Sequence, residues 1–283
     1  MKDTIRFLVF WVGTKCTLHC KDCCNLIPCK DCCNLIPYLQ QKSFDVDKIM
    51  DNLRYITKDI TVEALQIQGG EPFTHKEIHK IIQGCAENKN INKIEIATNG
   101  TILPNKQTID ILKKYSEKVV VRFSDYECTQ NKRTKIENEL IKESINVQNY
   151  EFMFSTGDWF DLGRVDKEKE TNFDKVIDIY KNCPNKSCWT LAEDYFAGCG
   201  RMISYLALKE NEAIEGNNII DINKLKQEKK AFIDEYQKFE NRYNNYNEPS
   251  ELCGYCQKND KLIPAGIQLN KDEINRYLGI SRS

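Results

Sequence analysis

The sequence has almost no surplus of charge of either sign. Its 41 lysines and arginines face 42 aspartates and glutamates, so the formal net charge is −1. A protein that binds a nucleic-acid backbone or an anionic membrane through its overall charge needs an excess of lysine and arginine. The composition therefore gives no support to nucleic acid or a membrane surface as a partner.

The chain also lacks a long apolar run. Its only strongly apolar stretch near the N-terminus, residues 7–13, is far shorter than the roughly 20 residues that span a bilayer. Cysteines follow this stretch in place of the small residues of a signal-peptide cleavage site. We therefore expect a soluble, cytoplasmic protein, and 283 residues suffice for one large domain or for one domain and a smaller one.

Cysteine, in contrast, is abundant, with 14 residues in the chain. The cysteines form two groups, at residues 16–33 and 183–256, and Cys85 and Cys128 lie between the groups. Close C-x-x-C spacings in a chain without a secretion signal favour metal or iron–sulfur ligation over disulfides. Cys85 falls on the apolar stripe of a predicted helix and Cys128 has no partner by spacing, so both are expected in the core.

Short β-rich runs alternate with amphipathic stretches in the first half of the chain. We expect strands at residues 5–12, 61–68, 93–97, 119–123 and 150–155. Helices are expected at residues 45–56, 107–115 and 133–143, and one more is expected to begin at the capping box of Thr74 and Glu77. This βαβ series predicts an α/β fold with a parallel sheet or barrel that is covered by helices.

Glycines, cysteines and polar residues follow the predicted strands directly. They include the first cysteine group, Gly69–Pro72, Thr98–Gly100 and Ser124. Because parallel strands end at the same edge of a sheet, and ligands bind at that edge in such folds, we expect these residues to form one site.

Cys16, Cys20 and Cys23 lie in the loop after the first predicted strand. Three thiolates can hold one face of a cubane iron–sulfur cluster and leave the fourth iron open to a small molecule, whereas structural sites normally supply four ligands. The run C16-T-L-H-C20-K-D-C23, followed after the second strand by G69-G70-E71-P72, resembles the radical S-adenosylmethionine (radical SAM) enzymes. The match covers both the order and the spacing of the motifs.

This resemblance implies a partial (β/α)6 TIM-like barrel over residues 1–175. It implies that the three cysteines hold a [4Fe–4S] cluster, whose open iron is chelated by the amine and carboxylate of S-adenosylmethionine. One electron from the cluster then cleaves the sulfonium, and the 5′-deoxyadenosyl radical abstracts a hydrogen atom from the substrate. The chain departs from the family at Asp22, where an aromatic residue commonly packs near the adenine.

The resemblance also assigns S-adenosylmethionine contacts to Gly69, Gly70 and Glu71, and to Asn99 and Ser124 after the next two strands. Glycines let a backbone approach a ligand closely, so carbonyl groups and a carboxylate can take the methionyl ammonium. Taken alone, Gly69–Pro72 could be a plain turn between a strand and a helix, and Asn99 and Ser124 could be ordinary turn residues.

Beyond residue 175 the pattern changes. We expect a helix at residues 174–182, a hairpin of residues 189–191 and 195–197, a charged helix at residues 222–243 capped by Asp221, and an asparagine-rich linker at residues 241–247. Cys188 and Cys199 are equally far from the centre of the hairpin turn, so they should face each other across it. Cys183 is the alternative to Cys188.

Cys253 and Cys256 add a C-x-x-C pair, which completes four thiolates. Zinc and an iron–sulfur cluster both fit this count. The arrangement resembles the twitch domain, a shortened SPASM extension of radical SAM enzymes, in which such cysteines hold an auxiliary [4Fe–4S] cluster. A small α+β twitch-like domain is therefore expected over residues 176–283, with the resemblance weakest at residues 200–250.

Together these features predict an enzyme whose auxiliary cluster accepts an electron from the substrate radical, so that the substrate is oxidised; the alternative role of this cluster is to anchor or orient the substrate. A flavodoxin- or ferredoxin-type reductant is expected to supply the electron that cleaves S-adenosylmethionine. The first cluster motif begins at Cys16, without a separate peptide-recognition domain before it, which favours a small molecule such as a sugar or nucleotide derivative. A maturase of ribosomal peptides is the alternative within the class. A non-catalytic iron–sulfur electron carrier or zinc-binding protein is the alternative outside it.

A nine-residue unit, CKDCCNLIP, occurs twice in tandem, at residues 20–28 and 29–37. Only the first copy keeps the three-residue gap from Cys16, so we assign its Cys20 and Cys23 as ligands. The remaining cysteines of the repeat are expected to be non-ligands in a lengthened loop: Cys24, Cys29, Cys32 and Cys33. The second copy is therefore interpreted as a tandem duplication or a sequence error rather than a third cluster site.

Overall fold

The computed structural model describes residues 3–21, 23–25, 32–33, 35–149, 158–163, 168–183, 188–208, 219–244, 248–258 and 261–279. Asp22 and Cys29 lie outside these ranges, and so does the whole strand expected at residues 150–155. Among the described residues, no helix has the length and apolar character that a bilayer crossing requires.

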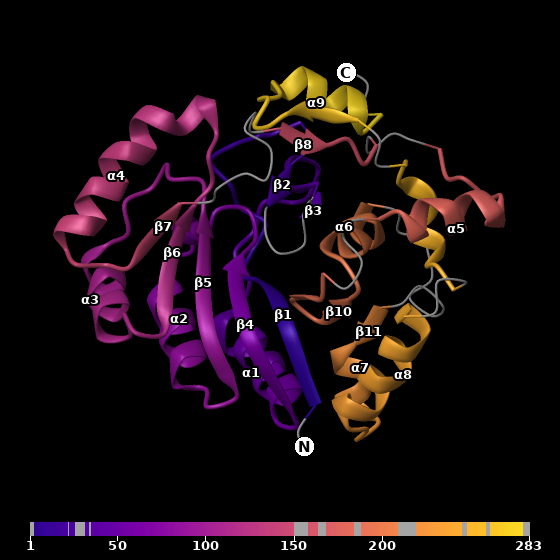
Figure 1. The fold of residues 1–283 in the computed structure, drawn as a ribbon, viewed down its shortest axis with the longest axis horizontal. Coiled ribbons are helices and arrows are strands. Elements are labelled where there is room, and N and C mark those ends of the chain that lie inside the picture. The colour runs from indigo at the N-terminus through magenta and orange to yellow at the C-terminus, as the bar shows by residue number, and fades with distance from the viewer. Residues whose placement is uncertain are drawn as a thin grey trace.

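Five parallel strands form the main part of the sheet (Figure 1). They are β1 (Asp3–Trp11), β4 (Ile60–Gln68), β5 (Ile91–Thr98), β6 (Val119–Phe123) and β7 (Val147–Asn149). The first four confirm the expected strands. The strand that pairs with β6 is β7, which ends just before the residues expected to form it.

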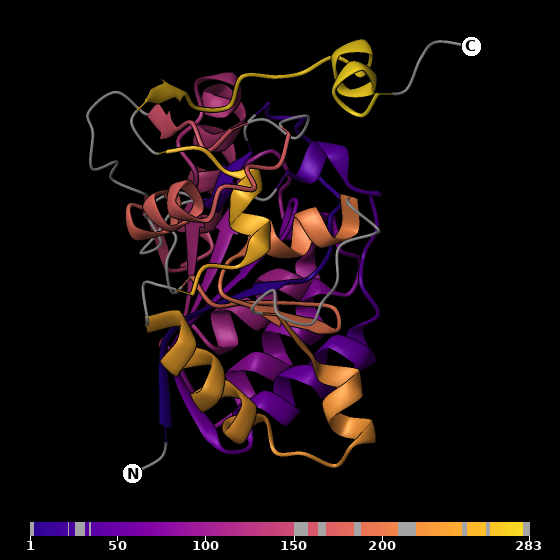
Figure 2. The ribbon, with the colours of Figure 1, turned by 90° about the vertical axis from the view of Figure 1, so that its right-hand side faces the viewer.

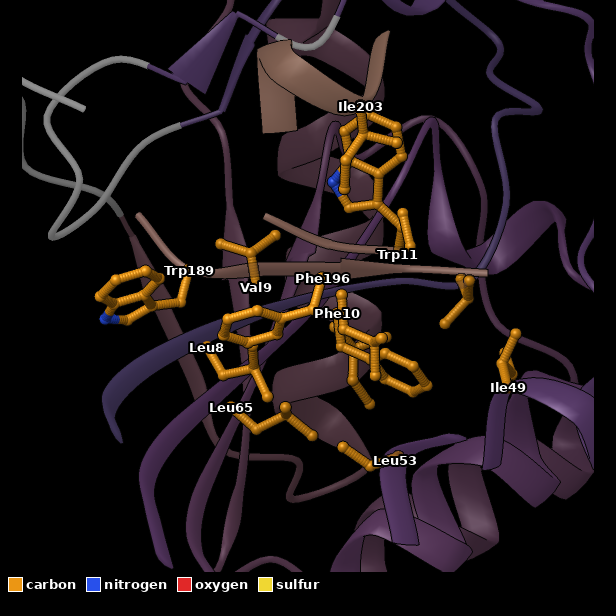
Figure 3. Packing of buried hydrophobic residues seen from close by; sticks show 14 of the residues in the cluster. Leu8, Val9, Phe10, Trp11, Ile49, Leu53, Leu65, Trp189, Phe196 and Ile203 are labelled. Atoms are coloured by element: carbon orange, nitrogen blue, oxygen red, sulfur yellow. The ribbon is translucent and has the colours of Figure 1, made fainter. Parts of the chain in front are cut away.

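Amphipathic helices connect these strands. They are α1 (Val46–Thr57), α2 (Ile78–Glu87), α3 (Lys106–Lys114) and α4 (Gln130–Lys142). The Asp45 carboxylate caps α1 by accepting a hydrogen bond from the Lys48 amide, and α1 buries Ile49 and Leu53 against the sheet (Figure 3). The predicted mixed α/β fold with a mainly parallel sheet is confirmed.

The helix expected from the capping box begins later than predicted. Pro72–Thr74 form a 3-10 turn, and α2 starts at Ile78 with Glu77 as the N-cap residue, whose side chain makes no capping hydrogen bond. The Thr74 hydroxyl instead donates to the carbonyl of Glu71, at 2.7 Å. The backbone amide of Thr74 donates to the same carbonyl at 3.0 Å, so the threonine closes the preceding turn and does not cap α2.

The sheet continues into the second half of the chain. Strand β9 (Thr190–Ala192) pairs in parallel with β1, and β10 (Tyr195–Ala197) and β11 (Ile219–Asp221) extend the sheet with antiparallel pairing. The expected hairpin is confirmed, whereas β11 was not expected. The sheet order is β11-β10-β9-β1-β4-β5-β6-β7, so the sheet crosses the domain boundary predicted near residue 175, and the two-domain division stays a prediction.

The single long helix expected at residues 222–243 is wrong. The chain forms α7 (Ile222–Gln227), capped by Asp221 as expected, and then α8 (Phe232–Asn244), which also occupies the start of the expected linker. Lys229 takes a left-handed conformation, and the amide of Lys230 donates to the carbonyl of Leu225 at 3.1 Å. This closing pattern ends a helix without a glycine, so composition alone did not reveal the break.

Aromatic packing explains why α8 turns back onto the sheet. Trp189 and Phe196 of the hairpin stack with ring centroids 5.8 Å apart, and Phe232, Tyr236 and Phe239 of α8 pack against them. Each such pair adds about 0.5–1.5 kcal/mol to the free energy of unfolding beyond simple burial. The break after α7 therefore places three aromatic side chains on the hairpin.

The two faces of the sheet carry different helices. In Figure 3, Trp11 and Ile203 lie on one side of β1, and Leu53 and Ile49 of α1 lie on the other. Ile203 belongs to α6 (Gly200–Leu208), which was not expected from the sequence. The face of the sheet that contacts α6 is called the inner face below.

The C-terminal residues return across the ends of the parallel strands (Figures 1 and 2). Strand β12 (Leu262–Pro264) pairs with β8 (Asp158–Phe160), and α9 (Lys271–Tyr277) follows. Between them, Gln268 forms an antiparallel bridge with Cys20. The segment of residues 262–270 is called the C-terminal strap below.

The duplicated nonamer forms a small hairpin of its own. Strands β2 (Cys24–Asn25) and β3 (Cys32–Cys33) pair antiparallel, so residues from one copy pair with residues from the other. After β3, Leu35 and Ile36 are buried in the core, and a 3-10 turn, η1 (Ile36–Tyr38), follows. The first copy therefore supplies Cys20 and Cys23, and the second supplies the buried leucine and isoleucine.

Candidate active site

Cys16 follows β1 and is held by residues from several loops. Its backbone amide donates to the side-chain oxygen of Gln41 at 3.0 Å. Its sulfur accepts two N–H groups, from the Leu18 amide at 3.4 Å and from the Asn99 side chain at 3.6 Å. The sulfur is thus positioned by donors, as the thiolate ligands of iron–sulfur clusters are.

Cys20 is 5% exposed and lies in a small apolar cluster with Tyr126, Trp159 and Leu162. The rings of Tyr126 and Trp159 meet edge to face, with centroids 5.5 Å apart. The Cys20 sulfur accepts the side-chain N–H of Gln268 at 3.1 Å. Cys23 packs against the same cluster, and its amide donates to the Cys20 carbonyl at 3.2 Å.

Burial controls the ionisation of these thiols. It raises the pKa of Cys16 to about 11, although the hydrogen bonds from the Leu18 and Asn99 N–H groups oppose the shift. Burial also raises the pKa of Cys20 to about 12, although the hydrogen bond from Gln268 lowers it. Both side chains are therefore neutral thiols at pH 7 and poor nucleophiles. A bound metal would deprotonate them, so their chemistry fits metal ligation better than covalent catalysis.

The two glycines of the G-G-E-P motif pack against the cysteine loop. The amide of Gly70 donates to the carbonyl of Gly13 at 3.0 Å, and the amide of Glu71 donates to the carbonyl of Lys15 at 2.8 Å. A Cβ atom at Gly69 would lie 2.1 Å from the Gly13 oxygen, and one at Gly70 would lie 2.2 Å from the Lys15 oxygen. Only glycine therefore allows the two motifs to lie in contact.

The Glu71 carboxylate joins this turn to the end of β5. It is 2% exposed and accepts hydrogen bonds from the Phe73 amide at 3.1 Å, the Thr98 hydroxyl at 2.9 Å and the Asn99 amide at 2.8 Å. Burial raises its pKa to about 7, although all three hydrogen bonds oppose the shift. The carboxylate thus braces the loops, and the backbone carbonyls of the motif stay the predicted ligands of a methionyl ammonium.

Asn99 and Ser124 lie at neighbouring strand ends. The Asn99 side-chain N–H also donates to the Thr17 hydroxyl, at 3.1 Å. The amide of Ser124 donates to the carbonyl of Thr98 at 2.8 Å, and Ser124 is 3% exposed. The structure therefore brings Asn99 to the loop of Cys16 and Ser124 to the adjacent strand end, and their contacts with S-adenosylmethionine stay predictions.

A second group of cysteines surrounds a small apolar cavity of about 30 Å³. Its cysteines come from the end of α5 (Phe173–Lys181), the start of α6 and the 3-10 turn η4 (Glu251–Tyr255): Cys183, Cys199, Cys253 and Cys256. Burial raises the pKa of Cys253 well above its usual value, and the neighbouring Cys256 and Cys183 raise it further. Four thiols from three elements thus converge here.

Cys188 is not among the cysteines that line this cavity. The hairpin register pairs Ala197 with Thr190, and its continuation sets Cys199 opposite Cys188, as expected. The Cys188 side chain, however, is 0% exposed and packs in the main hydrophobic core. Symmetry across the hairpin therefore does not decide which cysteines share the cavity, because α5 brings Cys183 to it from outside the hairpin.

No group of three or more His, Cys, Asp or Glu side chains within the described ranges is arranged to hold a metal ion. A cubane cluster is larger than one ion, and its ligands stand further apart.

Two glutamines at the first cysteine group had no signal in the sequence. The Gln41 side chain accepts a hydrogen bond from the Cys16 amide. The Gln268 side chain donates one to the Cys20 sulfur, from 248 positions away in the sequence. Cys128, which was expected in the core, is exposed and lies 3.8 Å from the side-chain nitrogen of Gln268. Gln268 reaches Cys20 and Cys128 because the C-terminal strap folds back over the cysteine loop.

A family model matches the part of the chain that contains the first cysteine group. The family model described as the radical SAM superfamily matches residues 12–145, which include the first cysteine group, the G-G-E-P turn, Asn99 and Ser124. Residues 12–145 are therefore similar to a radical SAM domain. No curated protein matches the chain.

Several solved structures are similar in fold. SuiB of Streptococcus suis is 19% identical with a TM-score of 0.40, over 52% of this chain and 33% of its own. The structure titled "Native anSMEcpe with bound AdoMet" is 16% identical with a TM-score of 0.38, over 50% of this chain and 43% of its own. BtrN, in complex with AdoMet and 2-DOIA, is 12% identical with a TM-score of 0.48, over 93% of this chain and 100% of its own. The chain thus spans about a third of the length of SuiB.

Proposed function

We propose that the protein is a radical SAM enzyme whose reactive [4Fe–4S] cluster is held by Cys16, Cys20 and Cys23. The observation that carries this proposal is the set of three thiols in one loop, with N–H donors directed at the sulfurs of Cys16 and Cys20. When bound, the cluster supplies one electron that cleaves S-adenosylmethionine to methionine and a 5′-deoxyadenosyl radical, which takes a hydrogen atom from the substrate.

The site for S-adenosylmethionine is proposed at the loops beside Cys16. Gly69, Gly70 and Glu71 would present backbone carbonyls to the methionyl ammonium, and Asn99 and Ser124 would contact the ribose and carboxylate. Support comes from the interlocked backbones of the two motifs and from the carboxylate of Glu71, which fixes the turn.

An auxiliary [4Fe–4S] cluster is proposed at the cavity of the second cysteine group. Its ligands would be Cys183, Cys199, Cys253 and Cys256. Cys183 thereby replaces Cys188 of the sequence-based set, and the cavity lining supports this choice. The auxiliary cluster would accept one electron from the substrate radical while the substrate releases a proton. The net reaction is then a two-electron oxidation of the substrate.

The inner face of the sheet supports a polar substrate. The strand register places Gln68 beside Trp11 and Gln66 beside Val9, on the face opposite α1. Glu95, beside Gln66, is also buried and accepts a hydrogen bond from Arg122 at 2.8 Å. Branched apolar side chains usually fill the inside of such barrels. A wall of buried polar groups therefore favours a sugar or nucleotide derivative.

Gln68 supplies the most direct test of this wall. Its side chain is 0% exposed, and neither its oxygen nor its nitrogen has a hydrogen-bond partner among the described residues. Burying an unsatisfied amide costs about 1–3 kcal/mol. We therefore expect Gln68→Met to raise the melting temperature of the protein alone, or to leave it unchanged, and to weaken a bound sugar, aminosugar or nucleoside about five- to tenfold.

Thermal shift measurements with a panel of sugars, aminosugars, nucleosides and short peptides would measure both effects. Gln83→Met is the matched control, because Gln83 pairs with Glu87 on the exposed side of α2. A Gln68→Met protein that melts several degrees lower and binds its ligand normally would show that the amide is structural. A response to peptides only would favour the maturase alternative.

Anaerobic reconstitution tests the proposed function as a whole. We expect about eight irons and eight sulfides per chain, and release of 5′-deoxyadenosine from S-adenosylmethionine with dithionite or a reduced flavodoxin. A flavodoxin- or ferredoxin-type reductant in the cytoplasm is the proposed electron source. Zinc without cleavage of S-adenosylmethionine would contradict the proposed enzymatic function and favour a zinc-binding protein. Iron without cleavage would contradict it and favour an electron carrier.

A further inference from the structure

The C-terminal strap lies against the loop that carries Cys20. The amide of Lys21 donates to the carbonyl of Ile267 at 2.7 Å, and the amide of Leu269 donates to the carbonyl of His19 at 2.8 Å. These two bonds enclose the bridge between Cys20 and Gln268. The strap therefore extends the cysteine loop as a short antiparallel pair and fixes the position of Gln268 on it.

The side chain of Gln268 makes contacts at both ends of its amide. Its oxygen accepts the backbone N–H of His19 at 2.8 Å, and its nitrogen donates to the Gly266 carbonyl at 2.7 Å. The same nitrogen donates to the Cys20 sulfur at 3.1 Å and lies 3.8 Å from the sulfur of Cys128. Because the amide is held at its oxygen, its nitrogen cannot rotate away from Cys20 without losing the bond to His19.

The surroundings of Cys20 strengthen such a contact. The sulfur lies among Tyr126, Trp159 and Leu162, with Trp159 only 1% exposed. A hydrogen bond in a setting of low dielectric is electrostatically stronger than one in water. Hydrogen bonds to cysteine sulfurs and solvent exposure are two of the factors that set the potential of an iron–sulfur cluster.

We propose that Gln268 is a positioning residue that holds the Cys20 sulfur by an N–H···S hydrogen bond and thereby raises the reduction potential of the reactive cluster. Reduction adds negative charge to the cluster and its thiolates, and a donor stabilises that charge more in the reduced state than in the oxidised state. This inference rests on the proposed function of Cys16, Cys20 and Cys23.

The sharpest variant is Gln268→Glu. It keeps an oxygen for the His19 N–H and replaces the N–H donor at Cys20 with an acceptor. We expect the equilibrium constant for one-electron reduction to fall about tenfold, which is about 59 mV. The measurement is a redox titration of the reconstituted protein, followed by the electron paramagnetic resonance signal that S-adenosylmethionine perturbs. Gln268→Leu removes the donor without adding charge and should shift the potential in the same direction by less.

Tyr38→Phe is the matched control. The Tyr38 hydroxyl donates to the carbonyl of Lys21 at 3.1 Å, so this variant loosens the same loop and removes none of the N–H donors described above at the sulfurs of Cys16 and Cys20. We expect its potential to equal that of the wild type. Circular dichroism of each apoprotein would establish that the variants are folded.

Two results would overturn the inference. One is an unchanged potential in both Gln268 variants. The other is an equal shift in Tyr38→Phe, which would show that any loosening of the loop has the same effect. Failure of the wild type to assemble a cluster that responds to S-adenosylmethionine would instead contradict the proposed function, so the two failures are distinguishable.

Discussion

Replacing Cys16 with alanine is expected to reduce 5′-deoxyadenosine formation to the background level and to lower the iron content from about eight to about four per chain. Three thiolates are the fewest that hold a cube with one open iron, so no ligand is dispensable. Cys20→Ala and Cys23→Ala should behave alike. Iron and sulfide analysis, with chromatography of the nucleoside product, would measure these losses.

Cys128→Ala is the control for this prediction. Cys128 lies in the same neighbourhood, since its sulfur contacts Gln268 and the carbonyl of Gly266, yet it is not a proposed ligand. It should keep its full iron content and its cleavage activity. Loss of the cluster in Cys128→Ala, or its survival in Cys16→Ala, would show that the ligand set is assigned wrongly.

A comparison of Cys183→Ala with Cys188→Ala should separate the ligand from the core residue. Cys183→Ala is expected to lose about four irons and to cleave S-adenosylmethionine without oxidising substrate, because the substrate radical has no electron acceptor. Cys188→Ala should retain both clusters and lose about 1 kcal/mol or more of unfolding free energy, since its side chain is 0% exposed. Cys253→Ala should match Cys183→Ala.

Iron analysis, product analysis and denaturant unfolding of the two variants provide the readouts. The opposite pattern, with iron lost from Cys188→Ala and retained in Cys183→Ala, would restore the hairpin assignment. Full coupling of cleavage to substrate oxidation in both Cys183→Ala and Cys253→Ala would remove the auxiliary cluster from the mechanism.

The sequence was sufficient for four of the five parallel strands, and for expecting Cys16, Cys20 and Cys23 in one loop, because the determinants of these features are local. Apolar runs, helical stripes and loop spacing act over a few residues. Gly69 and Gly70 were expected to let the backbone approach a ligand closely, and the structure shows that they let it approach the cysteine loop closely. Their missing side chains make room for Gly13 and Lys15, and this contact depends on how β1 and β4 lie side by side.

Features that depend on distant contacts could not be predicted. The choice between Cys183 and Cys188 depends on where α5 ends relative to η4. The break between α7 and α8 occurs at a lysine with no glycine or proline beside it, and it is favoured by aromatic packing on Trp189. Gln268 looks like any surface glutamine until the C-terminal strap folds back over Cys20.

The hairpin within the duplicated nonamer determines how much free energy it costs to lengthen or shorten the chain at this point. Strands β2 and β3 pair with each other, so the two ends of the loop that connects them lie close together. Adding residues to a loop whose ends already meet costs little free energy, because the loop-closure term grows only with the logarithm of length. Removing nine residues at this point should therefore cost little free energy and leave the cysteines before the hairpin and the buried residues after it in place.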